Sequence, residues 1–383
     1  MSDGRPSGKP VADGPRLAIV VHSLSAGGAE RVSVHLANSL AARGWRVSLI
    51  TLESRAGDFY PVAPAVARIA LAVAGESRGL AAALAGNLRR LVALRRALRA
   101  GGFDVVLGMT ATIAVLTILS ALGSGSRIVV SERIHPPTLR IGAAWHCLRK
   151  RVYRRADLVV VQSEQSLQWV ERQAPGSRAR VVPNPVVLPL PSSEPFVVPD
   201  RWVDPGRRLL LAVGRLEPQK GFDLLIDAFA VLAADHAAWT LVIVGEGAER
   251  SALEARAARL GLAGVVRMPG HAGNLADWYR RADLFVLSSR YEGFPNVLAE
   301  AMAHGCAAVS FDCPTGPRDI LRDEVDGLLV ESVEDPGALA GALARLMRDE
   351  ASREWMGTNA REVAARYAAG RVLGLWCDAL SPR

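Results

Sequence analysis

Apolar, β-branched segments alternate with helical segments along almost the whole chain, and they do so in two series. Strand–helix alternation favours parallel sheets covered by helices, so the pattern predicts an α/β protein with two doubly wound parallel-sheet domains. The first series of expected strands lies at 16–24, 45–51, 104–108, 127–131 and 158–163, and the second at 208–214, 239–245, 265–270, 283–289 and 307–311.

A proline-rich segment separates the two series. Residues 183–206 contain seven prolines and no helical period, a composition typical of an inter-domain linker. Two doubly wound domains on one linker face each other across a cleft, and parallel sheets bind ligands at their strand ends. We therefore expect a disordered tail at 1–15, a first domain at 16–190, a linker at 191–207, a second domain at 208–365, and a last helix at 366–383 that packs back on the first domain.

Composition limits the compartment and the partners. The 383 residues include 46 Lys+Arg and 38 Asp+Glu, which give a net charge of +8 and imply anionic partners. Four cysteines without Cys-x-x-Cys spacing are typical of free thiols in a reducing compartment. The start has no signal-peptide core, and residues 109–123 are too short for a membrane span and predict a buried helix. We expect a cytoplasmic protein.

Two glutamates in the segment EGFPNVLAEAMAHG predict a ligand site. Glu292 lies in a loop directly after the expected strand 283–289, and Glu300 lies in the first turns of the helix that follows. A helix N-terminus suits a diphosphate, and carboxylates accept hydrogen bonds from sugar hydroxyls. The segment therefore predicts a nucleotide-sugar pocket.

Cations occur at the end of the first strand of the second series. Gly214 closes this strand, Arg215 follows, and Lys220 precedes the next helix. Arg and Lys at a sheet edge suit a leaving phosphate, although alone they would be ordinary surface charges.

The first strand of the chain leads into the paired glycines Gly27 and Gly28, which let a backbone approach a ligand or simply make a strand-to-helix turn. No Asp-x-Asp occurs, so we expect no metal. Ser288 and Ser289 lie outside any nucleophile elbow. His22 is either structural or a substrate contact.

Two arginine-rich stretches, 78–102 and 133–155, contain no Asp or Glu. They predict either helices on an anionic membrane surface or plain solvated helix faces. Nothing in the chain matches a nucleic-acid-binding motif.

The segments GRLEPQKGFDLLIDAF, VIVGEGAERSALE, MPGH and EGFPNVLAEAMAHG occur in this order. Together they resemble family 4 of the retaining, nucleotide-sugar-dependent glycosyltransferases of the GT-B fold, and SAGGAERV and PNPV extend the resemblance to the N-terminal half. It implies a metal-independent hexosyltransferase without a cofactor, because the nucleotide sugar is a co-substrate. It also implies front-face attack, in which the leaving phosphate takes the acceptor proton.

The resemblance also implies roles for single residues. Arg215 and Lys220 would bind the donor diphosphate and stabilise the leaving nucleotide, while Glu292 would hold the donor sugar. Glu300 would hold the ribose hydroxyls. The remaining expected contacts to the donor are Gly27, Gly28, Gly214, Gly270 (near the base), Phe294, Pro295, Asn296 and Val297.

Two further segments resemble a subgroup that adds galactose, N-acetylgalactosamine or N-acetylglucosamine to lipid-linked oligosaccharides. They are VSFDCPTGPRDIL at 309–321 and SERIHPP at 131–137, and the second makes Glu132 and Arg133 acceptor- or sugar-side residues. The resemblance implies a UDP-sugar donor, a lipid-linked or glycan acceptor and cell-surface polysaccharide assembly. The basic stretches alone add the expectation of a peripheral position on the inner face of the plasma membrane. The alternatives are a non-catalytic sugar-nucleotide-binding or scaffold protein and a synthase-type enzyme with a soluble acceptor.

Overall fold

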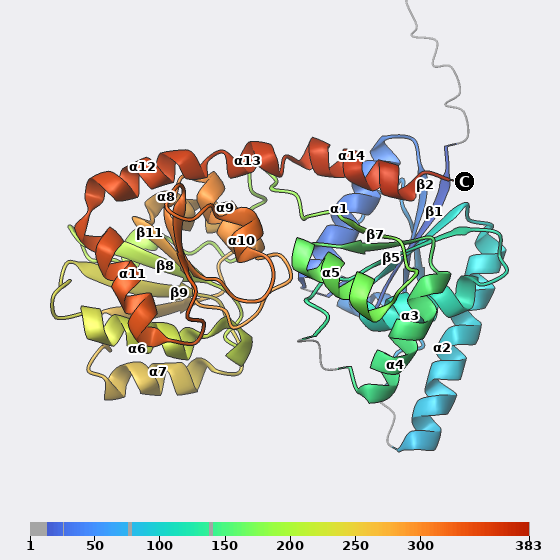
Figure 1. Cartoon of the computed structure of the whole chain (residues 1–383), viewed down its shortest axis with the longest axis horizontal. Coiled ribbons are helices and arrows are strands. Elements are labelled where there is room, and N and C mark those ends of the chain that lie inside the picture. Colours follow the sequence, from blue (N-terminus) through green and yellow to red (C-terminus); the bar gives the residue numbers. More distant parts are fainter. Residues whose placement is uncertain (1–13, 26, 76–78, 138–140, 383) are drawn as a thin grey trace, which may run out of the picture. The chain divides into compact units, whose positions relative to one another are not determined.

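The computed structural model describes residues 14–25, 27–75, 79–137 and 141–382, and most of the expected tail lies outside them. The chain divides into two compact units (Figure 1). Unit 1 comprises Met1–Gln162, Ser166–Val182 and Leu373–Arg383, and unit 2 comprises Ser163–Gln165 and Pro183–Val372. The proline-rich segment at 183–206 belongs to unit 2, because unit 1 stops at Val182 and resumes only at Leu373.

Unit 1 contains a seven-stranded, all-parallel sheet of order β3-β2-β1-β4-β5-β6-β7. Its apolar strands are buried on both faces, as expected when helices cover both sides of a parallel sheet. The strands are β1 (Arg16–Val21), β2 (Arg46–Thr51), β3 (Ala67–Ala70), β4 (Val105–Met109), β5 (Arg127–Ser131), β6 (Leu158–Val161) and β7 (Ala179–Val181).

Helices connect the strands of unit 1. The segment at 109–123 forms a largely buried helix, as predicted, and its buried side chains belong to an apolar core of unit 1 that also includes Val106 and Val130 of the sheet. The helices are α1 (Gly28–Ala42), α2 (Leu80–Gly101), α3 (Ala111–Ala121), α4 (Ala143–Val152) and α5 (Glu164–Gln173), with short 3-10 turns η1 (Arg55–Gly57) and η2 (Tyr153–Arg155).

Unit 2 contains a six-stranded parallel sheet of order β10-β9-β8-β11-β12-β13. Alternate residues of a strand face opposite sides of the sheet, so the strands supply two separate cores. For example, Leu210 and Ala212 belong to one core, and Leu209 and Leu211 to the other. The strands are β8 (Arg208–Val213), β9 (Trp239–Val244), β10 (Val266–Gly270), β11 (Leu284–Leu287), β12 (Ala308–Phe311) and β13 (Gly327–Val330).

The helices of unit 2 cover the two faces of its sheet. Helices α6, α7 and α11 lie on one face, and α8 and α9 on the other (Figure 1). The helical elements are η3 (Pro199–Arg201), η4 (Pro218–Lys220), α6 (Phe222–Leu232), α7 (Arg250–Arg259), α8 (Leu275–Arg281), α9 (Asn296–Ala303), α10 (Pro317–Ile320), α11 (Pro336–Arg348), α12 (Glu350–Ala360) and α13 (Val363–Arg366).

The structure confirms all ten strands expected from the sequence and adds three. The additional strands β3, β7 and β13 are short, and each lies at an edge of its sheet. Edge strands are often short and only partly buried, so their hydrophobic pattern is weak.

The C-terminal segment ends in a last helix, α14 (Ala369–Leu380). From Leu373 onward this helix belongs to unit 1, where Asp378 lies 3.7 Å from Arg180 and Arg43 donates to the Cys377 thiol.

Gly221 joins the end of η4 to the start of α6 in a left-handed conformation, with φ of 62°. A Cβ atom at this position would lie 2.1 Å from the carbonyl oxygen of Ser288. Two constraints therefore require glycine here: the positive φ and the close approach of the segment that follows β11.

We expect Gly221→Ala to destabilise unit 2 by at least about 2 kcal/mol more than Gly206→Ala. Gly206 also has a positive φ of 81°, but a Cβ atom there would meet nothing within 4 Å. The control therefore carries the backbone strain without the clash. Urea denaturation followed by tryptophan fluorescence measures both midpoints, and equal midpoints would contradict the packing described here.

Candidate functional site

The strand order of unit 2 reverses between β8 and β11. From β8 the chain proceeds to β9 and β10 on one side, whereas β11, β12 and β13 lie on the other. Loops that leave adjacent strands in opposite directions open a crevice at the carboxyl edge of the sheet, which is where open α/β sheets bind ligands. Both predicted motifs of this unit lie in these two loops.

The loop after β8 places Lys220 against the end of the strand. A Cβ atom at Gly214 would lie 3.3 Å from the Lys220 side chain, so the glycine makes room for the lysine stem. Arg215 points to solvent, with 65% of its side chain exposed, and forms an ion pair of 2.8 Å with Glu217. The two predicted phosphate-binding cations therefore differ: the lysine is packed, and the arginine is on the surface.

Lys220 and Glu292 form the central contact of this edge. Lys220 Nζ donates to Glu292 Oε1 at 2.6 Å, and the two side chains are only 15% and 7% exposed. The hydroxyl of Ser289 donates to the same carboxylate oxygen at 2.7 Å. The structure thus brings together two of the three residues that the sequence assigns to catalysis.

Backbone contacts fix the two loops to each other. The hydroxyl of Ser288 donates to the carbonyl of Lys220 at 2.9 Å, and the side-chain amide of Gln219 donates to the carbonyl of Tyr291 at 2.9 Å. Thr315, from the loop after β12, donates its hydroxyl to the carbonyl of Glu292. These bonds position the lysine and the glutamate before any ligand arrives.

A bidentate ion pair anchors the same loops to α6. Arg290 donates to both carboxylate oxygens of Asp223, at 2.9 and 2.8 Å. Burial acts to raise the pKa of Asp223, but the hydrogen bonds and charge of Arg290 outweigh it and hold that pKa below its usual value. The pair stays charged and holds the β11 loop over the start of α6.

Helix α9 begins within the predicted motif. Phe294 is buried edge-on against Tyr367, Pro295 precedes the first turn, and Asn296 Oδ1 accepts from the side-chain amide of Asn184 at 2.8 Å. Val297 lies in the first turn, where the N–H groups of Asn296 and Val297 precede the first helical hydrogen bonds, which Leu298 and Ala299 donate to the carbonyl of Pro295. This turn therefore offers donors at the same carboxyl edge as Lys220.

Glu300 lies one turn further along α9 and is buried. The hydroxyl of Tyr279, on α8, donates to Glu300 Oε2 at 3.2 Å. Gly270 ends β10 with φ of 94°, and a Cβ atom there would lie 3.0 Å from Glu246 Oε1. Gly270 thus lies beside the carboxylate of Glu246, which follows the end of β9.

In unit 1 the strand order reverses between β1 and β4, and the paired glycines follow β1. Gly27 caps α1, and its carbonyl accepts from the hydroxyl of Tyr60 at 3.1 Å. A Cβ atom at Gly28 would meet nothing within 4 Å. The backbone at Gly28 is therefore open to a ligand. His22, just after β1, pairs with Glu53 at 3.2 Å on the surface.

Glu132 and Arg133 follow β5 and are buried, with 2% and 7% of their surface exposed. Glu132 Oε1 accepts from Arg149 Nη1 at 3.2 Å and from the hydroxyl of Tyr153. Burial raises the pKa of Glu132 despite the charge of Arg149 and the bond from Tyr153. Burial also lowers the pKa of Arg133 to about 9. Glu132 is thus engaged by an internal network that the sequence did not reveal.

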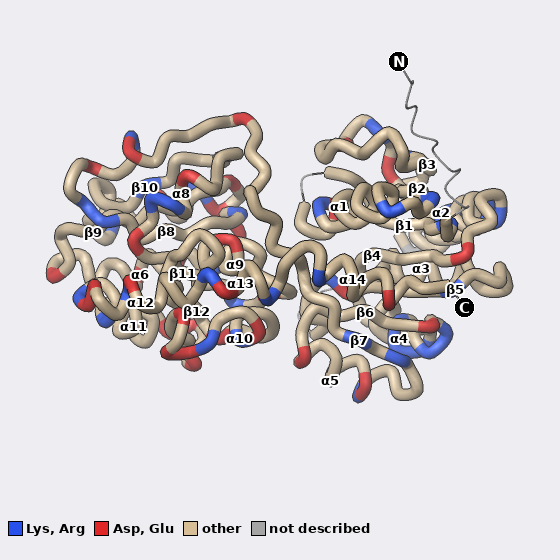
Figure 2. The backbone as a smooth tube through the Cα atoms, turned by 90° about the horizontal axis from the view of Figure 1, so that it is seen from above, with Lys and Arg blue, Asp and Glu red and all other residues tan. Residues whose placement is uncertain are grey.

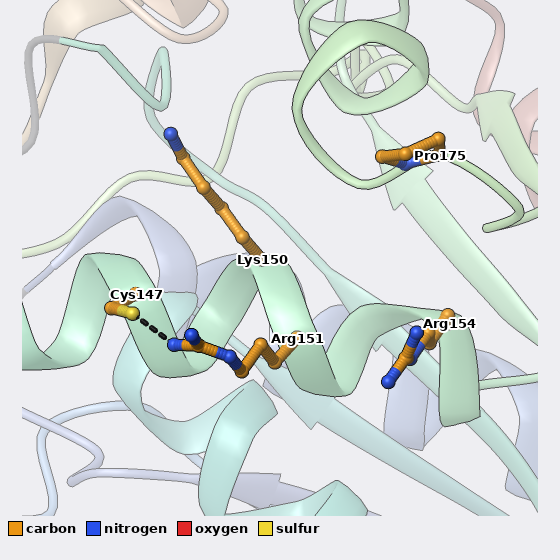
Figure 3. Close-up of a pocket in the computed structure, with 5 residues that line it drawn as sticks. All are labelled: Cys147, Lys150, Arg151, Arg154 and Pro175. Carbon is orange, nitrogen blue, oxygen red and sulfur yellow. Dashed lines mark hydrogen bonds between the residues drawn. The ribbon is translucent and has the colours of Figure 1, made fainter.

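A cationic cavity of about 370 Å³ lies on another part of unit 1 (Figure 3). Lys150, Arg151 and Arg154 line it, together with Cys147, which accepts a hydrogen bond from Arg151, and Pro175. Figure 2 shows the Lys and Arg positions gathered along α4. The sequence marked this stretch as basic, but the cavity also needs Pro175, which only the fold brings near.

The residues that position Glu292 were missed by the sequence analysis. The sequence analysis considered Ser289 only as a nucleophile and rejected it, and Thr315 lies in a separate segment.

Within the described ranges, no group of three His, Cys, Asp or Glu side chains is arranged to hold a metal ion. None of the described helices combines the length and hydrophobicity needed to cross a bilayer.

Comparisons with known proteins bear on both units. Residues 26–188 match the family model described as Glycosyltransferase Family 4, and residues 200–363 match the model described as Glycosyl transferases group 1. A Campylobacter jejuni α-1,4-N-acetylgalactosaminyltransferase, named for a diNAcBac-PP-undecaprenol substrate, is 27% identical over 94% of this chain and 97% of its own. An exopolysaccharide phosphotransferase of Streptomyces coelicolor is 34% identical over 74% of this chain, but this match spans only 29% of that protein.

Two solved structures share the fold. Sucrose-phosphate synthase from Thermosynechococcus elongatus aligns with a TM-score of 0.82 at 21% identity, covering 95% of this chain and 97% of that one. HepE from Anabaena, in complex with UDP, aligns with a TM-score of 0.77 at 20% identity, covering 96% and 99%. Both cover the two units described here.

We expect Arg149→Met to destabilise unit 1 by about 3–5 kcal/mol, because it leaves the Glu132 carboxylate buried without its cation. The double variant Glu132→Gln/Arg149→Met should regain most of that loss. Since burial raises the pKa of Glu132, the single variant should also recover stability as the pH falls and the carboxyl becomes neutral. Urea midpoints between pH 5 and pH 8 measure this, and a double variant no more stable than the single one would refute the pairing.

Proposed function

We propose, on the premise that this chain is a GT-B glycosyltransferase with an N-terminal family 4 domain and a C-terminal group 1 domain, that it is a retaining hexosyltransferase. Its donor is a UDP-sugar that carries a hexose or N-acetylhexosamine. Its acceptor is a hydroxyl of a lipid-linked or glycan molecule in the assembly of a surface polysaccharide. We further propose that it works from the cytoplasmic side, at an anionic membrane surface.

One observation carries the donor site: the Lys220–Glu292 ion pair at the strand-order reversal of unit 2. An ammonium has three donors, and Glu292 accepts one, so Lys220 keeps others for phosphate oxygens. Glu292 Oε1 already accepts from Lys220 and Ser289, which leaves Oε2 for sugar hydroxyls. The pair can thus hold both ends of the sugar–phosphate bond that breaks.

The remaining residues fit around this centre. The first-turn amides of α9 and the exposed guanidinium of Arg215 supply further positive charge for a diphosphate. Arg215 would exchange its surface partner Glu217 for the phosphate. Glu300 and Gly270 lie on elements flanking the same edge, where ribose and base would extend.

The choice of donor and acceptor is supported by the relatives. The Campylobacter protein is named for a polyprenyl-diphosphate-linked glycan, and HepE was solved with UDP. The net charge of +8 also favours an anionic surface. Front-face transfer fits a site in which Lys220 holds the Glu292 carboxylate. The carboxylate then stabilises the positive charge that develops on the donor sugar and does not attack the sugar as a nucleophile.

We expect the protein to bind and slowly hydrolyse one UDP-sugar in a panel of UDP- and GDP-sugars. Lys220→Met should lower turnover by ~10²–10³, with a smaller effect on binding, because the leaving phosphate gains most charge in the transition state. Isothermal titration and release of nucleotide measure the two effects separately.

Arg280→Gln is the matched control, because Arg280 is an exposed cation of unit 2 paired with Asp277. It should keep wild-type turnover. No response to any sugar nucleotide would end the proposal, and wild-type turnover in Lys220→Met would remove the lysine from it. Mass spectrometry of products formed in a membrane-lipid extract, compared with soluble sugar phosphates, separates the lipid-linked acceptor from a synthase-type one.

We expect the transferase activity to persist in excess chelator. Lys220, Arg215 and the amides of α9 provide the positive charge that a divalent ion supplies elsewhere. Initial rates with EDTA, and after adding Mg²⁺ or Mn²⁺ back, measure this. Complete loss that either metal reverses would contradict a metal-independent site.

A further inference from the structure

Helix α2 is only half covered by the rest of unit 1. Among its described side chains, only Leu94 and Leu98 are buried, and both lie in the second half of the helix against the core that includes α3. Residues 81–93 contain no fully buried side chain, and Leu91 is the residue among them that packs, partly buried, against this core. Figure 1 shows this first half extending to one end of unit 1. Because isolated helical segments are marginal in water, this half would gain from a partner.

The uncovered half carries an apolar stripe, which we call the α2 stripe: Leu84, Leu88 and Val92. These side chains are 72%, 61% and 39% exposed. Their spacing of four residues places each about 40° around the helix from the one before, so they share one face. A row of exposed apolar side chains on one helix face is a candidate interaction surface.

Arginines flank the stripe. Arg89, Arg96 and Arg99 are exposed, and no Asp or Glu occurs between Gly79 and Gly102. In the part of the chain that the structure describes, none of the three has a carboxylate within ion-pair distance. Arg90 and Arg95 instead donate to backbone carbonyls, of Gly75 and of Leu122, and so hold the helix to the unit.

The combination of an apolar stripe and flanking arginines favours one kind of partner over others. A nucleic acid would be attracted by the arginines but would leave the leucines in water. An anionic bilayer satisfies both, because acyl chains take the leucines while lipid phosphates pair with the guanidiniums. We propose that α2 is the membrane-docking element of the protein, lying in the interface with the α2 stripe inserted among the lipids. The inference deepens the proposed function, since a lipid-linked acceptor must be reached at the bilayer surface.

Flotation of the full chain with vesicles tests the proposal. Wild-type protein should bind phosphatidylcholine vesicles that contain phosphatidylglycerol, and pure phosphatidylcholine much more weakly. Leu84→Gln/Leu88→Gln should weaken binding roughly tenfold at unchanged net charge, and glutamine keeps helix propensity. The matched control is Val231→Gln/Leu260→Gln, which removes two exposed apolar side chains from unit 2 and should bind as wild type.

A second pair of variants separates local docking from overall positive charge. Arg89→Gln/Arg96→Gln/Arg99→Gln should weaken binding more than Lys150→Gln/Arg151→Gln/Arg154→Gln, which removes the same charge from the cationic cavity. If both triple variants bind equally weakly and the leucine variant binds as wild type, the attraction is diffuse and α2 is not the docking element. Binding that does not need vesicles, such as co-sedimentation with an acidic protein or with RNA, would also overturn the proposal.

Hydrogen exchange gives a readout at the helix itself. Amides of residues 81–93 should exchange more slowly when phosphatidylglycerol vesicles are added, and unchanged exchange there would contradict docking through α2. Because these measurements use no sugar nucleotide and no acceptor, their failure would leave the donor chemistry of Lys220 untouched. Conversely, a protein that turns over no donor could still dock.

Discussion

The ion pair between Lys220 and Glu292 is the contact on which the rest of the site depends. Its two side chains come from the loops after β8 and β11, adjacent strands whose chains depart in opposite directions. A lysine and a glutamate that are mostly shielded from water lose hydration, and their mutual attraction at 2.6 Å offsets part of that cost. Ser289 and Thr315 hold the glutamate, and Gly214 and Gly221 allow the lysine and its loop to come close. The packing at this edge therefore fixes a charged pair where an anionic ligand can approach.

Unit 1 contains a similar pair with a different consequence. Arg149 and Glu132 have side chains that are 0% and 1% exposed; the hydroxyl of Tyr153 donates to the glutamate, and the guanidinium lies over the ring of Trp169. Such a fully buried pair contributes to the geometry of the turn after β5. The comparison shows that pairing of an acid with a base does not identify a reactive site by itself. Position at a strand-order reversal and access from the carboxyl edge distinguish the pair of unit 2.

The net positive charge is unevenly compensated. In unit 2 many arginines have carboxylate partners, among them Arg256 with Asp227, Arg290 with Asp223 and Arg345 with Glu324. The cations of α2 and of the α4 cavity lack such partners within the described residues. Uncompensated charge extends further into solution than paired charge, so the positive field of unit 1 is the less screened of the two by its own carboxylates.

The sequence by itself determined the two parallel sheets, since ten buried strands with continuous apolar runs are visible without any tertiary information. It also determined that Lys220 and Glu292 follow strands, and hence that both lie at a carboxyl edge. Only the tertiary structure decided that β8 and β11 are neighbours, that Ser289 and Thr315 support Glu292, and that Arg149 is buried while Lys150 is exposed. The tertiary structure was also needed to reveal the short edge strands β3, β7 and β13 and the uncovered half of α2. Local patterns report the period of burial, whereas adjacency and exposure depend on which distant segments pack against each residue.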